Sequence, residues 1–233
     1  MKKTLLFISL MLAIAAGARA QIITEQDIEA IDMTQFDTDG DGKVKDQEAA
    51  LAIKELYGLD KNNAITRVTV IEDIPKNKEQ IYVAVNDWFV RSFNDSKAVI
   101  QLNDKEAGCI IGKGYINKMG RTKSFFTNSD VSAYVIIRVD IRDNRMRITT
   151  TIQDYVMEKS SGTGMKILRG ISGAGPISTS KVVNYIPSDC FPFTDKQKKE
   201  GAIGFVKGHI YSLVAINKLS DAVLNDLGGS DDW

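Results

Sequence analysis

Apolar and polar side chains alternate most regularly between Asp130 and Arg142. An apolar residue at every second position predicts a β-strand with one buried face. The Asp143-Asn144 pair that follows is a two-residue turn signal, so the chain should fold back as a β-hairpin. With that turn Asp140 faces Arg147 on the polar side, and four inward pairs result: Ile141 with Met146, Val139 with Ile148, Ile137 with Thr150 and Val135 with Ile152.

The chain around this hairpin predicts three more strands and two helices. Strands are expected at 65–72, in KAVIQLN (97–103) and in GCIIGKGYI (108–116). Asn77 and Gln80 can cap a helix whose inward positions are Ile81, Val85, Trp88, Phe89 and Ser92. A last helix is expected over 195–227, capped by Thr194. Gly201, Gly204 and Gly208 weaken its start but allow close packing on the sheet. Its apolar stripe is Val206, Ile210, Leu213, Ile216, Val223 and Leu224.

The order strand, helix, four strands, helix predicts an α+β domain over 64–228, an antiparallel sheet with helices on one face. Between the hairpin and the last helix, the glycine-rich stretch 160–192 is expected to be a flexible loop. A phosphate-binding loop is disfavoured there, because no G-K-[ST] ending is present and no strand runs directly into a helix.

The first twenty residues have the pattern of a signal peptide. Lys2 and Lys3 precede the apolar run 5–16, and Ala18-Arg19-Ala20 is an A-x-A cleavage site. The run is too short to span a bilayer comfortably, although a short anchor is the alternative. The protein is therefore expected to be exported, to the periplasm or beyond, with Gln21 as its first residue and no membrane span.

Charge argues against one class of partner. The chain of 233 residues has 30 basic and 30 acidic side chains, and loss of the signal peptide leaves a formal charge of −3. Nucleic-acid binding needs a basic footprint, so no nucleic-acid partner is expected. The remaining residues suffice for one domain and a small module, which we place at 21–60.

The stretch FDTDGDGKVKDQEA (36–49) carries the strongest chemical signal. Counted from Asp37, it has acidic residues at positions 1, 3 and 5, glycine at 6 for a sharp turn and glutamate at 12, and the apolar Val44 at position 8 is expected to point inward. Calcium is a hard cation that takes six to eight oxygen ligands, and this spacing supplies them. The expected ligands are the side chains of Asp37, Asp39, Asp41 and Glu48, with the backbone carbonyl of Lys43; Lys45 at position 9 would act through a water.

The flanks agree with this reading. Thr24 and Asp27 can begin a helix that carries Ile28, Ile31 and Phe36, and QEAALAIKELYG (47–58) is a strong helix former that ends at Gly58. Helix, twelve-residue loop and helix resemble an EF-hand over 24–59. The sequence contains no second loop, so the hand would pack on the neighbouring domain, pair with a partner or bind weakly. An Asp/Gly-rich loop without metal is the alternative.

A second resemblance covers the larger domain. ITRVTVIEDIPKNKEQIYVAVNDWFVRSFNDSKAVIQLNDKEAGCIIGKGYI, followed by the YVIIRVDIRDNRMRITTTIQDYVME hairpin, resembles a family of uncharacterised exported bacterial proteins. That domain of unknown function is described as having a TATA-binding-protein-like (TBP-like) fold. The resemblance implies the fold alone, because the family has no assigned activity, and the fold name does not imply DNA binding.

Few residues are suited to catalysis. His209 is the only histidine and lies in an apolar helical segment, where a packed or a solvent-tipped role is favoured over a catalytic one. Cys109 and Cys190 form either a disulfide or, with Cys109 in an apolar run, a buried free thiol and an unpaired partner. Asp140 and Asp154 could be nominated as an acid/base pair, but strict alternation places them on opposite faces of the hairpin.

Three functions remain open. The first is a non-enzymatic calcium-binding module of the envelope or extracellular space, with an unknown protein or glycan partner. Its contact surface would be the polar hairpin face with Tyr134, Arg138, Arg142, Arg145 and Arg147, unless that face is only solvated. The second is a secreted hydrolase with an unidentified site. The third is a structural protein in which calcium clamps the N-terminal helices to the domain.

Overall fold

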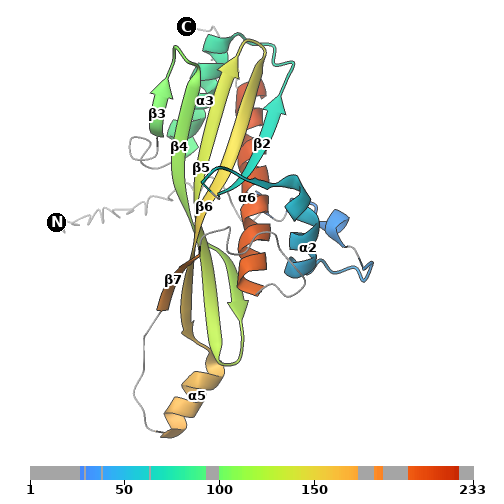
Figure 1. Ribbon diagram of the computed structural model, residues 1–233, viewed down its shortest axis with the longest axis vertical. Coiled ribbons are helices and arrows are strands. Elements are labelled where there is room, and N and C mark those ends of the chain that lie inside the picture. The colour runs from blue at the N-terminus through green and yellow to red at the C-terminus, as the bar shows by residue number, and fades with distance from the viewer. Residues whose placement is uncertain are drawn as a thin grey trace, which may run out of the picture.

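The computed structural model describes residues 27–28, 30–37, 39–62, 64–92, 100–172, 181–185 and 199–225. The predicted signal peptide and the predicted helix caps at Thr24 and Thr194 lie outside these residues, as does Cys190. Figure 1 shows one long antiparallel sheet with helices along one face. The predicted α+β class is therefore confirmed.

The sheet contains seven strands, and six of them follow the order β1-β2-β6-β5-β4-β3 while β7 pairs with β6. The central strands β4, β5 and β6 run through the whole molecule, and the shorter strands attach to their upper or lower halves (Figure 1). The bounds are β1 Gly58–Leu59, β2 Ile65–Ile71, β3 Ile100–Asp104, β4 Cys109–Lys123, β5 Thr127–Arg142, β6 Arg145–Ser161 and β7 Lys181–Tyr185.

The β5–β6 hairpin has the predicted register. All four inward pairs form as expected, and Asp140 faces Arg147. The Asn144 backbone takes a positive φ of 61°, which asparagine tolerates in a tight turn. Arg147 Nη2 lies 2.8 Å from a carboxylate oxygen of Asp140, and Arg138 Nη2 lies 2.7 Å from the other oxygen. The two guanidinium groups hold the pKa of Asp140 below its usual value against the opposing effect of burial.

One prediction about this hairpin is wrong. Tyr134 pairs with Asp154 and Val135 with Ile152, so Gln153 is an extra residue in β6. This β-bulge reverses the inward alternation beyond it, and Asp154 lies on the same face as Asp140 rather than on the opposite one. The two carboxylates still do not form a pair, because six residues of β5 separate the positions that face them, or about 20 Å along the strand.

Helix α3 (Lys78–Ser92) covers the upper half of the sheet. Its cap is reciprocal as predicted: the Gln80 N–H donates to Asn77 Oδ1 over 2.9 Å, and the Asn77 N–H donates to Gln80 Oε1 over 3.0 Å. All five predicted inward side chains are buried. Four of them, all except Ser92, enter the main hydrophobic core with residues from β4, β5, β6 and the last helix.

Helix α6 (Lys199–Asn225) runs along the same face of the sheet as α3 (Figure 1). Gly204 and Gly208 of this helix lie close to the sheet, as predicted. A Cβ at Gly204 would meet Val131 of β5 at 3.2 Å, and one at Gly208 would meet Ile152 of β6 at 2.6 Å. The predicted stripe is buried at Val206, Ile210, Ile216 and Val223, but Leu224 near the helix end is 41% exposed. The Lys76 ammonium donates to the Val223 carbonyl and satisfies a terminal acceptor of the helix.

The stretch 160–192 is not the single loop that its glycines suggested. Strand β6 continues to Ser161, helix α5 occupies Thr163–Ser172, and β7 follows at Lys181–Tyr185. The Gly162 N–H donates to the Phe126 carbonyl and the Gly164 N–H to the Phe125 carbonyl. These glycines therefore anchor the backbone close to the β4–β5 turn, and the helix-forming run after them continues as α5.

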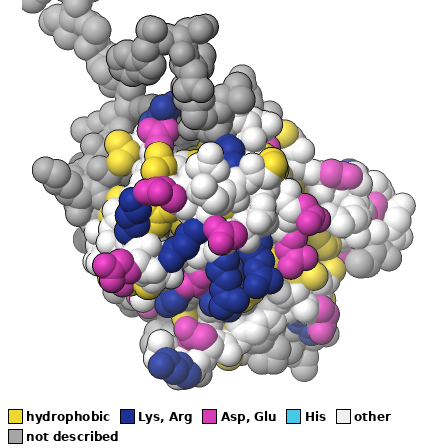
Figure 2. All heavy atoms as spheres, turned by 90° about the horizontal axis from the view of Figure 1, so that it is seen from above, with side chains coloured by type: hydrophobic (Ala, Val, Ile, Leu, Met, Phe, Trp, Pro, Cys, Tyr) yellow, Lys and Arg dark blue, Asp and Glu magenta, His cyan; other side chains and the backbone are white. Residues whose placement is uncertain are grey.

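Charge is mixed at the end of the molecule that carries α3 and the β5–β6 turn. Figure 2 looks onto this end and shows a group of Lys and Arg side chains bordered by Asp and Glu. The exposed Arg142 and Arg145 flank the hairpin turn there, and Lys105 pairs with Glu79. This end is a solvated surface of both signs.

We expect Gly112→Ala to destabilise the fold. A Cβ at Gly112 would lie 2.4 Å from the Phe89 ring of α3, and a rigid aromatic ring in a packed core cannot give way cheaply. The free energy of unfolding in urea should fall by about 1–3 kcal/mol. Gly170→Ala in α5 is the matched control, since nothing lies within 4 Å of its Cβ position, and it should leave stability unchanged or slightly raised. Equal losses in both variants would contradict this account of α3 packing.

Candidate functional site

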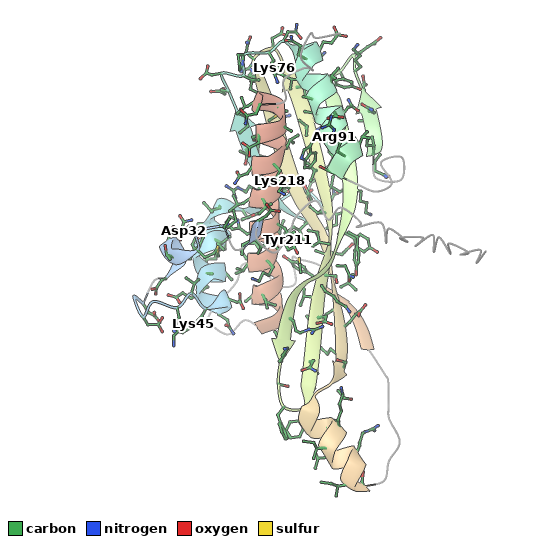
Figure 3. The ribbon with its side chains drawn as sticks, turned by 180° about the vertical axis from the view of Figure 1, so that it is seen from behind. Asp32, Lys45, Lys76, Arg91, Tyr211 and Lys218 are labelled. Atoms are coloured by element: carbon green, nitrogen blue, oxygen red, sulfur yellow. The ribbon has the colours of Figure 1, made fainter. Side chains whose placement is uncertain are left out.

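The acidic loop lies between two short elements that pack on α6. It follows the 3₁₀ turn η1 (Thr34–Phe36) and leads into α2 (Asp46–Ile53), which ends in a second 3₁₀ turn, η2 (Lys54–Leu56). Phe36, Ala50 and Ile53 are buried in a cluster with Phe205 and other α6 residues. Figure 3 shows α2 on α6 and the loop projecting away from both, with Lys45 at its outer edge.

The predicted incoming helix is not formed up to Phe36. Asp27 and Ile28 are helical, but Asp32 and Met33 are not, and only Thr34–Phe36 make a 3₁₀ turn. Asp32 accepts hydrogen bonds from the Thr34 N–H at 2.9 Å and the Thr34 hydroxyl at 2.6 Å. An aspartate side chain that accepts a hydrogen bond from the backbone N–H two residues later favours a turn over a helix interior.

The N-terminal segment is nevertheless attached to α6. Ile28, Ile31 and Met33 pack against the cluster around Phe205, as does Val44, the loop residue predicted to point inward. Lys218 of α6, labelled in Figure 3, pairs with Asp27 over 2.7 Å. The segment that carries the acidic loop therefore packs on the neighbouring domain through α6.

Three of the predicted ligands converge. Asp37, Asp39 and Glu48 each offer a carboxylate oxygen, and these atoms lie within 4.8 Å of one another. Gly42 has a φ of +79°, the left-handed conformation that the predicted sharp turn at position 6 requires. The turn directs the N–H groups of Gly40 and Gly42 onto Asp37, at 2.8 and 2.9 Å.

Further backbone donors stabilise the carboxylates. The Asp39 N–H donates to Glu48 Oε1 at 2.9 Å, which joins the start of the loop to α2. The Asp41 N–H donates to Asp39 at 3.1 Å, and the Lys43 N–H donates to Asp41 at 2.8 Å. Each bond offsets part of the repulsion between neighbouring negative charges.

Lys45 neutralises the outer side of the loop. Its ammonium lies 2.8 Å from Asp39 and 2.9 Å from Asp41, so Asp41 faces Lys45 and is not among the three converging carboxylates. The hydrogen bond from Lys45 lowers the pKa of Asp39, and the same contacts raise the pKa of Lys45. The sequence predicted only that Lys45 would contact the ion through a water. The positive charge at position 9 was the signal that could have indicated its ion pairs with Asp39 and Asp41.

The donor set fits a hard divalent cation. Carboxylate oxygens are the ligands that calcium prefers, and the loop supplies three within reach of one ion. Asp41 and the Lys43 carbonyl are the remaining oxygen donors that the sequence pattern assigns.

A buried polar cluster missed by the sequence lies beneath α2. The Tyr57 hydroxyl lies 2.8 Å from His209 Nδ1, and an Arg67 guanidinium nitrogen lies 3.4 Å from the same atom. His209 is only 1% exposed, and its ring meets Phe36 and Tyr57 edge-on. Burial, assisted by the Arg67 charge, lowers the pKa of His209 to about 4. Of the packed and solvent-tipped roles expected for this histidine, the structure shows the packed one, and the ring joins α6 to β2 and to Tyr57, the residue after η2.

This histidine should make the fold acid-sensitive. Its pKa is depressed in the folded state, so its contribution to stability is complete above about pH 6.5 and is lost as the pH falls towards 4. The expected loss is up to about 3 kcal/mol, measured as the free energy of urea unfolding at pH 7 and pH 4. His209→Gln keeps a hydrogen-bonding group but cannot titrate, and should remove this part of the pH dependence. An unchanged profile in that variant would assign acid sensitivity to other groups.

Cys109 is a buried free thiol, and burial raises its pKa, so it lacks the character of a reactive nucleophile.

On the outer face of the sheet, Tyr115 and Tyr134 lie with ring centroids 4.8 Å apart, and the Lys113 ammonium is 5.2 Å from the Tyr134 ring. This face also carries Arg138, Asp140 and Arg147. The polar alternation of β5 would also place Ser132 there, but Ser132 is buried and accepts the Lys118 N–H at the bulge of β4.

Comparison with known proteins agrees with the fold. Residues 69–155 match a family described as a domain of unknown function (DUF4468) with TBP-like fold. A TBP-like protein from Parabacteroides distasonis ATCC 8503 is 15% identical, with a TM-score of 0.49 over 72% of this chain and 97% of that one. A DUF4468 family protein from Bacteroides ovatus ATCC 8483 is 10% identical, with a TM-score of 0.45 over 76% and 94%. No curated protein gives a significant match.

The family match supports a DUF4468 domain with a TBP-like fold at 69–155, as the resemblance in the sequence implied. The acidic loop and helix α6 lie outside the matched residues. Among the described residues, no helix combines the length and apolarity needed to cross a membrane.

Proposed function

We propose that the protein is an exported, non-enzymatic calcium-binding module of the cell envelope or extracellular space. The observation that carries the proposal is the convergence of Asp37, Asp39 and Glu48 in a loop with the EF-hand spacing. These three residues would hold one ion, with Asp41 and the Lys43 carbonyl as further donors. Extracellular calcium modules work at about 10⁻⁴ to 10⁻³ M, which suits a single unpaired loop.

The position of the loop supports a clamping role for the ion. Asp37 and Asp39 follow the η1 turn, whereas Glu48 belongs to α2, and the Asp39–Glu48 hydrogen bond already joins the two sides. An ion bound by all three would tie η1 to α2 while Phe36 and Ala50 hold both elements on α6. Calcium would thereby stabilise the N-terminal module on the larger domain.

Lys45 sets the affinity in this proposal. Its ammonium already offsets the charge of Asp39 and Asp41, so a calcium ion gains less from those carboxylates than it would in a loop without an internal cation. Removal of that charge increases the net negative charge available to the ion.

The outer sheet face is the proposed contact surface for a protein or glycan partner. Tyr115 and Tyr134, whose rings are in contact, supply exposed aromatic area, and Arg138 and Arg147 supply donors arranged around Asp140. Aromatic and arginine side chains are enriched where proteins recognise partners.

Calcium titration by calorimetry tests the metal site directly. The processed chain should bind one ion with a dissociation constant of about 10⁻⁴ to 10⁻³ M, and Glu48→Gln should abolish the heat. Lys45→Met should tighten binding by several-fold, whereas Lys43→Met, with the same loss of charge outside the carboxylate pairs, should change it less. Absence of heat at millimolar calcium in the unmodified chain would sink the metal assignment.

Thermal unfolding with and without a chelator separates the clamp from a recognition role. If the ion clamps the module, calcium should raise the free energy of unfolding by RT ln(1 + [L]/Kd), about 1.4 kcal/mol at tenfold excess over Kd. The melting temperature should rise accordingly. Partner capture from the cell envelope should then be unchanged by chelation as long as the protein stays folded. Loss of capture without unfolding would place the partner site at the loop instead of the sheet face.

A further inference from the structure

An apolar surface lies at the end of the molecule opposite to the β5–β6 turn. Figure 1 shows α5 there, beyond the reach of α2 and α6 and next to the β4–β5 turn. Ile171 is 81% exposed, Phe125 61% and Leu168 52%. We call this surface the arm tip, and its apolar residues are Phe125, Phe126, Met165, Ile167, Leu168 and Ile171.

The two parts of the arm tip are held together by the backbone. Gly162 and Gly164 donate to the carbonyls of Phe126 and Phe125, over 2.8 and 2.6 Å. A Cβ at Gly164 would lie 2.0 Å from the Phe125 ring, so only glycine lets the turn and the helix approach this closely. The Phe125 and Phe126 rings pack edge-to-face, 5.1 Å apart. The arm tip is therefore one continuous surface.

Helix α5 is amphipathic. Ile167, Leu168 and Ile171 have the i, i+1, i+4 spacing of one helix face, and Lys166 and Arg169 occupy the other side. In the part of the chain that the structure describes, its main packing contact is with the end of β6. Its apolar face is exposed, whereas a helix that served only to stabilise this domain would bury that face against the sheet.

The charge around the arm tip has one sign. The segments 123–129 and 159–172 contain Lys123, Lys159, Lys166 and Arg169 and no acidic residue. The first carboxylates further along β5 and β6, Asp130 and Glu158, face each other across these strands, and Asp130 is bound by Arg121. The opposite end of the molecule differs, since both signs are mixed there (Figure 2).

We propose that the arm tip attaches the protein to an anionic lipid surface. Apolar and aromatic side chains beside lysine and arginine are the combination by which helices lie in the interface of a bilayer, with the cations on the lipid headgroups. A second copy of the chain fits less well, because a two-fold contact would bring the same basic residues against each other. Attachment at this end would leave the acidic loop and the outer sheet face in solvent.

The proposal is independent of calcium binding, and vesicle flotation tests it. The processed full chain should float with phosphatidylcholine vesicles that contain about 30% phosphatidylglycerol, and bind pure phosphatidylcholine vesicles at least about fivefold more weakly. Ile167→Asn with Ile171→Asn should lower binding by about tenfold or more, and Lys123→Gln with Lys166→Gln by about fivefold per lysine. Both pairs are exposed, so the melting temperature should not change.

Matched controls distinguish binding at the arm tip from non-specific adsorption of the protein to vesicles. Val83→Asn with Val90→Asn removes two valines of α3 that are 59% and 54% exposed, and Arg142→Gln with Arg145→Gln removes two charges from the opposite end. These variants should float like the unmodified chain. Absence of flotation, or equal losses in control and arm-tip variants, would overturn the proposal. It would also fall if the arm-tip variants changed only a monomer–dimer equilibrium in sedimentation, which would assign the surface to a second copy.

Discussion

The burial of α6 on two sides is the constraint on which the rest of the structure depends. Ile203 and Tyr211 pack on the sheet, whereas Ala202, Phe205 and Ile210 pack towards η1 and α2. A helix that is apolar on most of its circumference needs a cover on each side. The sheet supplies one cover and the N-terminal module the other, so the two predicted units share a hydrophobic core.

This shared core places the acidic loop. Phe36 before the loop and Ala50 after it are both buried against α6, which brings the two ends of the loop together. Repulsion between the converging carboxylates is then offset locally, by backbone N–H groups inside and by Lys45 outside. The polar cluster of Tyr57, Arg67 and His209 lies under the same cover, where burial keeps the imidazole neutral.

Irregularities in the long strands β4, β5 and β6 separate the half of the sheet that α3 covers from the half that ends in the arm tip. The pairing of β4 with β5 shifts between Ile116 and Gly120, and the pairing of β5 with β6 shifts at Gln153. Above these positions α3 and the C-terminal half of α6 cover the sheet, and below them β4, β5 and β6 continue to the arm tip with β7 alongside (Figure 1). Bulges bend and twist a sheet. The same three strands can therefore pack under helices in one half and extend to the arm tip in the other.

The sequence by itself determined the elements with strong local signals. The hairpin register, the Asn77–Gln80 cap and the inward face of α3 all follow from periodicity and turn chemistry. The loop spacing predicted four converging carboxylates, of which Asp37, Asp39 and Glu48 converge and Asp41 does not. Tertiary structure decided what depends on contacts distant in sequence. The extra residue in β6, the pairing of Lys45 with Asp39 and Asp41, and the buried His209 cluster leave no periodic trace. Helix α5 does have a helical spacing of apolar residues, but the glycines around it predicted a loop. Only the packing of Gly162 and Gly164 on the Phe125–Phe126 turn, nearly forty residues earlier, fixed its place.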